Sequence, residues 1–351
     1  MKRIPLLCIP FLFFSLKAFA QLGGSTAYAF LNTTSSARIA ALGGHFISVR
    51  DNDLNLAFQN PALLNKDMHT QLTLSGVSYF ADIKYGYAAY ANHYPKVGTF
   101  SAGIHFVSYG EFQEADITGQ ITGVFKASDY SFNLAYSKPL DSAFNIGATL
   151  KTIYAQYETY SSFGLAADVG GSYYNPDIDF AASLVLKNVG YQLKPFREEN
   201  REDLPFEIAL GLSKKLAKAP FRFSLNVTNM QKWDLTYKDP AKEGLVDPIT
   251  QEPIEETFTF TNKLMRHFIF GLEFIPSQNF HVDIGYNYRR RQELKEEAKL
   301  GLSGFSFGVG FRVSKFHLSY GRAMYHLAGA SNHISVTTAI NKLFPVKAAQ
   351  E

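Results

Sequence analysis

The residues of this sequence that could carry out catalysis or bind a metal ion are few and far apart. Its nine histidines occur singly, without the His-Glu-x-x-His spacing that holds catalytic zinc on a helix. No Gly-x-Ser-x-Gly segment is present, so the nucleophile turn of the common α/β hydrolases is missing. Cys8 is the only cysteine, which excludes disulfides and thiolate-bound zinc. We therefore expect no catalytic residue, no cofactor and no metal site, although Ser/His or Asp/His groups assembled by the fold would leave no recognisable spacing.

The acidic run Asp51-Asn52-Asp53-Leu54-Asn55 resembles the start of a calcium-binding loop. Such a loop requires Gly at its sixth position and Glu at its twelfth. Here those positions hold Leu56 and Ala62. We interpret the run as a hydrogen-bonded acidic turn.

Most of the chain after about residue 70 consists of segments in which apolar and polar residues alternate. Along 130–137, Tyr, Phe, Leu and Tyr alternate with Ser, Asn, Ala and Ser, and 280–289 follows the same pattern. Alternation of this kind is typical of β-strands. The apolar face is rich in Phe and Tyr, whereas the cores of soluble β-sandwiches favour compact Val, Ile and Leu. The pattern therefore predicts an all-β transmembrane barrel with aromatic side chains facing lipid.

Short turns and longer links alternate between these segments, as they do in outer-membrane barrels. The short connections contain Pro, Asn or Asp, which favour tight reversals, and the long links lie near Tyr109–Ala127, Tyr191–Leu204, Gln231–Asn262 and Gln292–Leu302. We predict about fourteen antiparallel strands, or about twelve or sixteen if one hairpin is missed or added. The predicted strands lie near 71–79, 83–92, 97–108, 128–137, 143–157, 162–174, 178–189, 205–216, 220–231, 263–275, 280–291, 303–313, 316–326 and 332–343.

Charged residues on the polar face of these strands must point into the lumen, because a cation facing lipid near the midplane costs about 2–4 kcal/mol. Charges of both signs are present, so we expect them to pair with one another and fasten an internal segment. The alternative is an ion-conducting path. The predicted lumen residues are Lys151, Glu207, Arg222, Glu273, Asp283, Arg289 and Arg312.

The N-terminus predicts export. Lys2 and Arg3 precede an apolar run that ends near Ala20, and this run is too short to span a bilayer as a helix. We expect a signal peptide over 1–20, a non-alternating plug over 21–69, a barrel over 70–344 and a tail over 345–351, in the outer membrane of a Gram-negative bacterium. The net charge of +3, from 34 basic and 31 acidic residues, gives no reason to expect nucleic-acid binding.

The predicted plug contains the most distinctive motifs of the chain. A small-residue run holds Arg38 and ends at Gly43 and Gly44, the acidic turn holds Asp51 and Asp53, and Asn60-Pro61-Ala62 precedes the first strand. Asn can hydrogen-bond its nearby backbone, Pro fixes φ, and Ala allows close packing. We interpret Asn60, Pro61 and Ala62 as a turn that positions the plug.

These motifs resemble the FadL-like outer-membrane barrels, in which an N-terminal segment plugs the lumen. Together with the run Tyr28-Ala29-Phe30-Leu31-Asn32, they are most similar to the PorQ subfamily of the type IX secretion system. This resemblance implies a non-catalytic outer-membrane anchor that tethers an extracellular PorZ-like protein. Its implied associates are PorU-like and PorV-like members of the attachment complex, which joins cargo to lipopolysaccharide. The alternative is a FadL-type channel for hydrophobic small molecules.

The long link Gln231–Asn262 is a candidate surface for the extracellular partner. It contains the only tryptophan, Trp233, together with Tyr237 and several acidic residues. Aromatic side chains in polar surroundings suit protein docking. A loop without a partner is the alternative.

Overall fold

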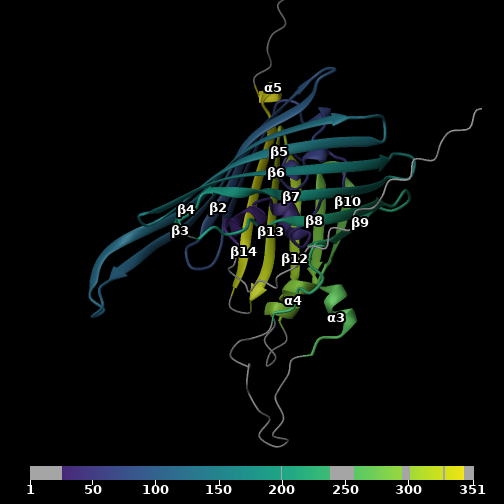
Figure 1. Ribbon diagram of the computed structural model, residues 1–351. Helices are drawn as coiled ribbons and strands as arrows, with labels where there is room; N and C mark the ends of the chain where they lie inside the picture. Colours follow the sequence, from purple (N-terminus) through teal and green to yellow (C-terminus); the bar gives the residue numbers. More distant parts are fainter. Residues whose placement is uncertain (1–25, 199, 238–256, 295–300, 327–328, 344–351) are drawn as a thin grey trace, which may run out of the picture.

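The computed structural model describes residues 26–198, 200–237, 257–294, 301–326 and 329–343 (Figure 1). The predicted signal peptide and C-terminal tail lie outside these ranges. Among the described residues, no helix has the length and apolar character needed to cross a membrane.

Fourteen antiparallel strands form a closed barrel, which confirms the predicted fold (Figure 1). Each strand pairs with its neighbours in the sequence, and β1 closes the barrel on β14 through the register Gln71↔Ala339 to Ser78↔Asn332. The strands are β1 Gln71–Ser78, β2 Lys84–Tyr94, β3 Gly98–Ala115, β4 Ile121–Pro139, β5 Phe144–Tyr157, β6 Tyr160–Asn175, β7 Phe180–Lys194, β8 Glu207–Lys215, β9 Phe221–Val227, β10 Phe268–Ser277, β11 Phe280–Asn287, β12 Phe305–Val313, β13 Phe316–His326 and β14 Gly329–Ala339.

The two faces of the barrel follow the alternation in the sequence. On β4, Phe132 and Leu134 are exposed on the outer face, whereas Ser131 and Asn133 are buried toward the lumen. Short turns join the strands at one end of the barrel, which we call the turn end, and β14 ends there. The opposite end, the loop end, carries the longer connections (Figure 1).

Several elements differ from the predicted boundaries. The link predicted over Tyr109–Ala127 is mostly strand, because β3 and β4 continue as a hairpin that projects beyond the barrel through the register Phe112↔Phe125 (Figure 1). At the loop end, β11 gives way to helix α4 (Tyr288–Leu294), and helix α3 (Phe260–Met265) precedes β10. At the turn end, helix α5 (Ile340–Leu343) follows β14.

The segment before β1 folds inside the barrel as a chain of short helices (Figure 1). They are η1 (Ala29–Asn32), α1 (Ala37–Ala41), α2 (Leu56–Gln59), η2 (Pro61–Leu63) and η3 (Lys66–Met68). Side-chain caps define the starts of α1, η2 and η3, with Ser36 accepting a hydrogen bond from the amide of Ile39, Asn60 from that of Ala62 and Asn65 from that of Asp67. We call residues 26–70 the plug, and most of the buried apolar core lies between the plug and the lumen wall.

Candidate functional site

Helix α1 of the plug packs directly on glycines of the lumen wall. A methyl group on Gly285 would overlap the backbone of Leu42 and Gly43, and one on Gly308 would overlap the side chain of Ala41. Glycine inside a strand commonly marks such a close backbone approach. Four consecutive strands carry these residues, which we call the glycine track: Gly271, Gly285, Gly308 and Gly321.

Gly43 and Gly44 end the helix in a conformation that suits glycine. Their φ angles are +93° and +100°, in the region that other L-residues rarely adopt. The carbonyl of Gly43 accepts a hydrogen bond from the side chain of Asn287 on β11 at 3.2 Å. The helix therefore stops where the chain must turn along the wall.

Arg38 projects from α1 into a buried cluster of charges that joins the plug to β9 and β10. Its guanidinium lies 2.7 Å from Asp51, 2.8 Å from Glu273 and 3.4 Å from Asp53. Arg222 donates to the other oxygen of Glu273 at 2.9 Å. We call these five residues the Arg38 cluster. Breaking a buried pair of this kind by removing one partner costs about 3–5 kcal/mol.

Arg38 and Asp51 of this cluster remain charged. Burial opposes ionisation of Asp51, but the guanidiniums of Arg38 and Arg222 outweigh it and lower the pKa of Asp51 to about 2. Burial likewise opposes the charge on Arg38, whereas Asp51, Glu273 and Asp53 raise its pKa above the ordinary value. Ion pairs therefore hold the plug to the lumen wall over the physiological pH range.

A second polar network joins the plug to β5, β6 and β7. Lys151 lies 2.7 Å from Asp168 and donates to Asn188 at 2.8 Å. Asn188 in turn donates to Asn32 of the plug at 2.9 Å. On β7, Lys187 donates to Gln59 of the plug at 3.1 Å and lies 3.7 Å from Glu207.

The Asn60-Pro61-Ala62 turn lies against β5 and β6. Asn60 is fully buried, donates to the carbonyl of Ile47 at 3.0 Å and accepts from the amide of Ala62 at 3.0 Å. A methyl group on Gly147 would overlap Pro61, and one on Gly170 would overlap Asn60. Wall glycines therefore accommodate this turn as they accommodate α1.

The first plug residues fill an apolar compartment on the other side of the lumen. Tyr28, Phe30 and Leu31 are at most 3% exposed and pack with residues of β1 to β6. The hydroxyl of Tyr28 lies 2.5 Å from that of Ser162 on β6, and Phe30 stacks on His105 with 5.5 Å between the ring centres. Side chains of the plug thus occupy the interior of this half of the barrel.

A cavity of about 290 Å³ remains at the turn end between the plug and the wall. Its apolar lining includes Leu63, Leu64 and Phe144, and its basic lining includes Arg50 and Lys66.

Two of the seven charged residues predicted for the lumen network lie elsewhere. Arg289 was assigned to the polar face of a strand, but β11 ends at Asn287, and Arg289 donates to Glu293 within α4 at 2.8 Å. Arg312 is an exposed residue near the turn-end limit of β12, beside Asn52 of the plug. The other five, Lys151, Glu207, Arg222, Glu273 and Asp283, face the lumen and are buried.

Trp233 and Tyr237 lie at the loop end and are 50% and 54% exposed. Trp233 packs against Phe260 and His267, with 5.3 and 5.9 Å between the ring centres. Residues 238–256 of the predicted docking link lie outside the described residues.

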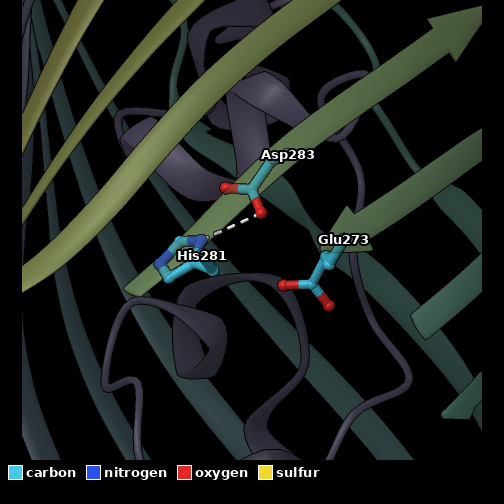
Figure 2. A group of neighbouring side chains, drawn as sticks. All are labelled: Glu273, His281 and Asp283. Atoms are coloured by element: carbon cyan, nitrogen blue, oxygen red, sulfur yellow. Dashed lines mark hydrogen bonds and ion pairs between the residues drawn. The ribbon is translucent and has the colours of Figure 1, made fainter. Parts of the chain in front are cut away.

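Several lumen residues were not predicted from the sequence, among them Lys187, Asp168 and His281, which is the partner of the predicted Asp283. Figure 2 shows His281 and Asp283 on β11 beside Glu273 on β10. Nδ1 of His281 lies 2.9 Å from a carboxylate oxygen of Asp283. Because side chains two positions apart on a strand share a face, the spacing His-x-Asp was the available signal.

Comparison with known proteins identifies the fold. No model of a known protein family matches the sequence, and no curated protein matches it. The structure of the toluene transporter TbuX of Ralstonia pickettii is similar, with a TM-score of 0.52 at 11% identity over 88% of this chain and 97% of that one. The toluene transporter TodX of Pseudomonas putida gives 0.51 at 11% identity, over 87% and 96%. The chain therefore shares the β-barrel fold of these two structures.

Proposed function

We propose that this protein is a non-catalytic anchor in the outer membrane, with its turn end toward the periplasm and its loop end outside the cell. The observation that carries the proposal is the fit of the plug, since added methyl groups on Gly285, Gly308 and Gly321 would overlap α1 and the residues that end it. Opening the lumen would also separate Arg38 from Glu273 and Arg222 from Asp51, the two pairs of the Arg38 cluster that join the plug to the wall, and breaking a buried pair costs about 3–5 kcal/mol. A barrel closed in this way suits a platform better than a pore.

The loop end offers a surface for an extracellular partner. The β3–β4 hairpin projects from the barrel (Figure 1) and carries stacked Phe112 and Phe125, with 5.2 Å between the ring centres. An isolated two-stranded hairpin is marginally stable in water, so a partner that covers this one would stabilise it. Half-exposed Trp233 gives a second aromatic contact.

The sequence resemblance supports a specific setting for such an anchor. In the PorQ-like setting, the partner is a PorZ-like surface protein, and PorU-like and PorV-like proteins complete a type IX attachment complex that joins cargo to lipopolysaccharide. The barrel would hold this complex at the outer membrane and take no part in its chemistry.

Truncation of the projecting hairpin tests the anchor. Residues 112–125 are replaced by a two-residue turn between the paired Glu111 and Lys126, and recovery of the PorZ-like partner with the tagged barrel is measured from native membranes. We expect recovery to fall at least tenfold. Replacement of exposed Phe307 on the lipid face by Leu is the control and should leave recovery unchanged. Undiminished recovery with the truncated hairpin would count against this docking surface.

A second candidate function is a channel for hydrophobic small molecules, such as the toluene named for the two structural relatives. The observations that favour it are the shared fold and the apolar compartment around Phe30, which a small displacement of the plug would vacate. Toluene uptake by cells with and without the protein tests this candidate. If the channel operates, Tyr28→Ala should increase uptake, because it removes the side chain that bonds Ser162.

A further inference from the structure

Three buried side chains with metal-binding atoms converge on the lumen wall beside the Arg38 cluster (Figure 2). Asp283 lies directly opposite Glu273 in the β10–β11 register, and His281 precedes Asp283 by two positions on the same face. One nitrogen and two carboxylate oxygens, one atom from each side chain, all lie within 4.8 Å of one another. This convergence follows from strand pairing, which fixes the three backbones relative to one another.

Two polar atoms of these side chains have no hydrogen-bond partner among the described residues. They are the second carboxylate oxygen of Asp283, a residue 1% exposed, and Nε2 of His281, which faces Gly310 on the ring edge opposite Nδ1 and so lies outside the group in Figure 2. A buried carboxylate oxygen without a partner is costly in an apolar or water-poor environment. The arrangement of protein groups alone therefore leaves this carboxylate incompletely satisfied.

The charges around this group also indicate that a positive charge is missing. The carboxylates of Glu273, Asp283, Asp51 and Asp53 face the two guanidiniums of Arg38 and Arg222. These four carboxylates and two guanidiniums sum to a formal charge of −2 in a largely buried space. Buried charge of one sign requires a counter-charge, and a single divalent cation supplies it.

We propose that Glu273, His281 and Asp283 bind a divalent transition-metal ion, of which Zn²⁺ and Mn²⁺ suit the donor set best. An imidazole with two carboxylates suits these ions, whereas Ca²⁺ and Mg²⁺ prefer oxygen donors alone. The 2.9 Å between Nδ1 of His281 and the oxygen of Asp283 is close to the roughly 3 Å between neighbouring ligands of an octahedral ion with bonds of about 2.1 Å, and shorter than the roughly 3.4 Å of a tetrahedral zinc site. To join the same shell, the Glu273 oxygen, which now lies within 4.8 Å of both atoms, would have to come to roughly 3 Å from them.

The arginines that bond Glu273 serve as outer-shell donors to the ion. Arg38 and Arg222 donate to its two carboxylate oxygens at 2.9 Å each, and ligating carboxylates are commonly hydrogen-bonded in this way. Because Arg38 belongs to the plug, the ion joins β10, β11 and the plug into one unit. The site thus acts as a structural clamp on the closed barrel.

Metal binding by the purified full-length protein tests this site. The protein is treated with a chelator, dialysed and titrated separately with Zn²⁺, Mn²⁺ and Ca²⁺. Inductively coupled plasma mass spectrometry then measures how much of each ion the protein retains. We expect one Zn²⁺ or Mn²⁺ ion per chain, no retained Ca²⁺, and at least tenfold weaker binding in Asp283→Asn and in His281→Ala. The matched controls are Asp129→Asn and His333→Gln, which change buried lumen residues outside the site and should bind as the wild type does.

If Asp283→Asn or His281→Ala fails to fold, a spectroscopic measurement on the wild-type protein still tests the site. Co²⁺ bound at the site should give visible absorption bands of a nitrogen- and oxygen-coordinated ion, and Zn²⁺ should abolish them by competition. Substoichiometric uptake by the wild type, absence of these bands, or equal binding by folded ligand variants would overturn the proposal.

Discussion

Replacement of Arg38 by glutamine should weaken the attachment of the plug more than any other single change in it. Arg38 is 7% exposed, and its guanidinium lies 2.7 Å from Asp51 and 2.8 Å from Glu273. Removing one partner of a buried ion pair costs about 3–5 kcal/mol. Because Arg222 still pairs with Glu273 at 2.9 Å, we expect the lower end of that range, about 3 kcal/mol.

A loss of about 3 kcal/mol corresponds to roughly a 100-fold shift in the equilibrium between the docked and the released plug. Hydrogen exchange measured by mass spectrometry reports that equilibrium for each segment. Amides of residues 26–70 should exchange about 100-fold faster in Arg38→Gln, while those of the barrel strands stay unchanged.

Arg50→Gln is the matched control for this experiment. Arg50 is an exposed arginine of the same plug, which donates to the carbonyl of Ser142 at 3.3 Å and lies over the ring of Tyr174. An exposed contact of this kind contributes less than about 1 kcal/mol, so the plug of Arg50→Gln should exchange within a fewfold of the wild type. Equal exchange in the two variants would refute the account of the Arg38 cluster.

Three further predictions concern the plug and its fit. Gly285→Ala should destabilise the docked plug by about 1–3 kcal/mol through overpacking, whereas Gly76→Ala, where a methyl group meets no atom within 4 Å, should not; thermal unfolding of the two variants compares them. Asn60→Ala should cost about 0.5–2 kcal/mol, because it removes the cap on Ala62; chemical denaturation measures this loss. The pKa of Asp51 is lowered from 3.8 to about 2, so its contribution to plug stability should persist above pH 3.8 and disappear as the pH falls toward 2; proteolysis of the plug by pepsin across that range follows the loss.

The barrel was predictable because its signal is local. Each strand reveals its two faces through alternation, as at Ser131 and Phe132, and the turns between strands carry residues with turn preferences. The prediction failed where a strand leaves the membrane. From Glu111 onward on β3, both faces of the hairpin are exposed, so its sequence resembles that of a loop.

The fit of the plug was not predictable, because each contact joins residues far apart in the sequence. The sequence around Gly321 gives no sign that the backbone of Ala37 packs against this glycine. The network around Lys187 and Asn188 was missed for a related reason, since a register shift on β7 and a φ of +56° at Asn188 place consecutive side chains in the lumen. The partners Asn32 and Gln59 come from the plug and have no sequence signal of their own.

Native mass spectrometry of the protein, extracted gently from its own outer membrane, tests the central claim most directly. If the barrel is a closed anchor, it should be released in a stoichiometric complex with a large extracellular protein, and its lumen should hold no small apolar ligand. Release of the barrel alone, with a hydrophobic small molecule bound inside, would contradict the anchor and support the channel.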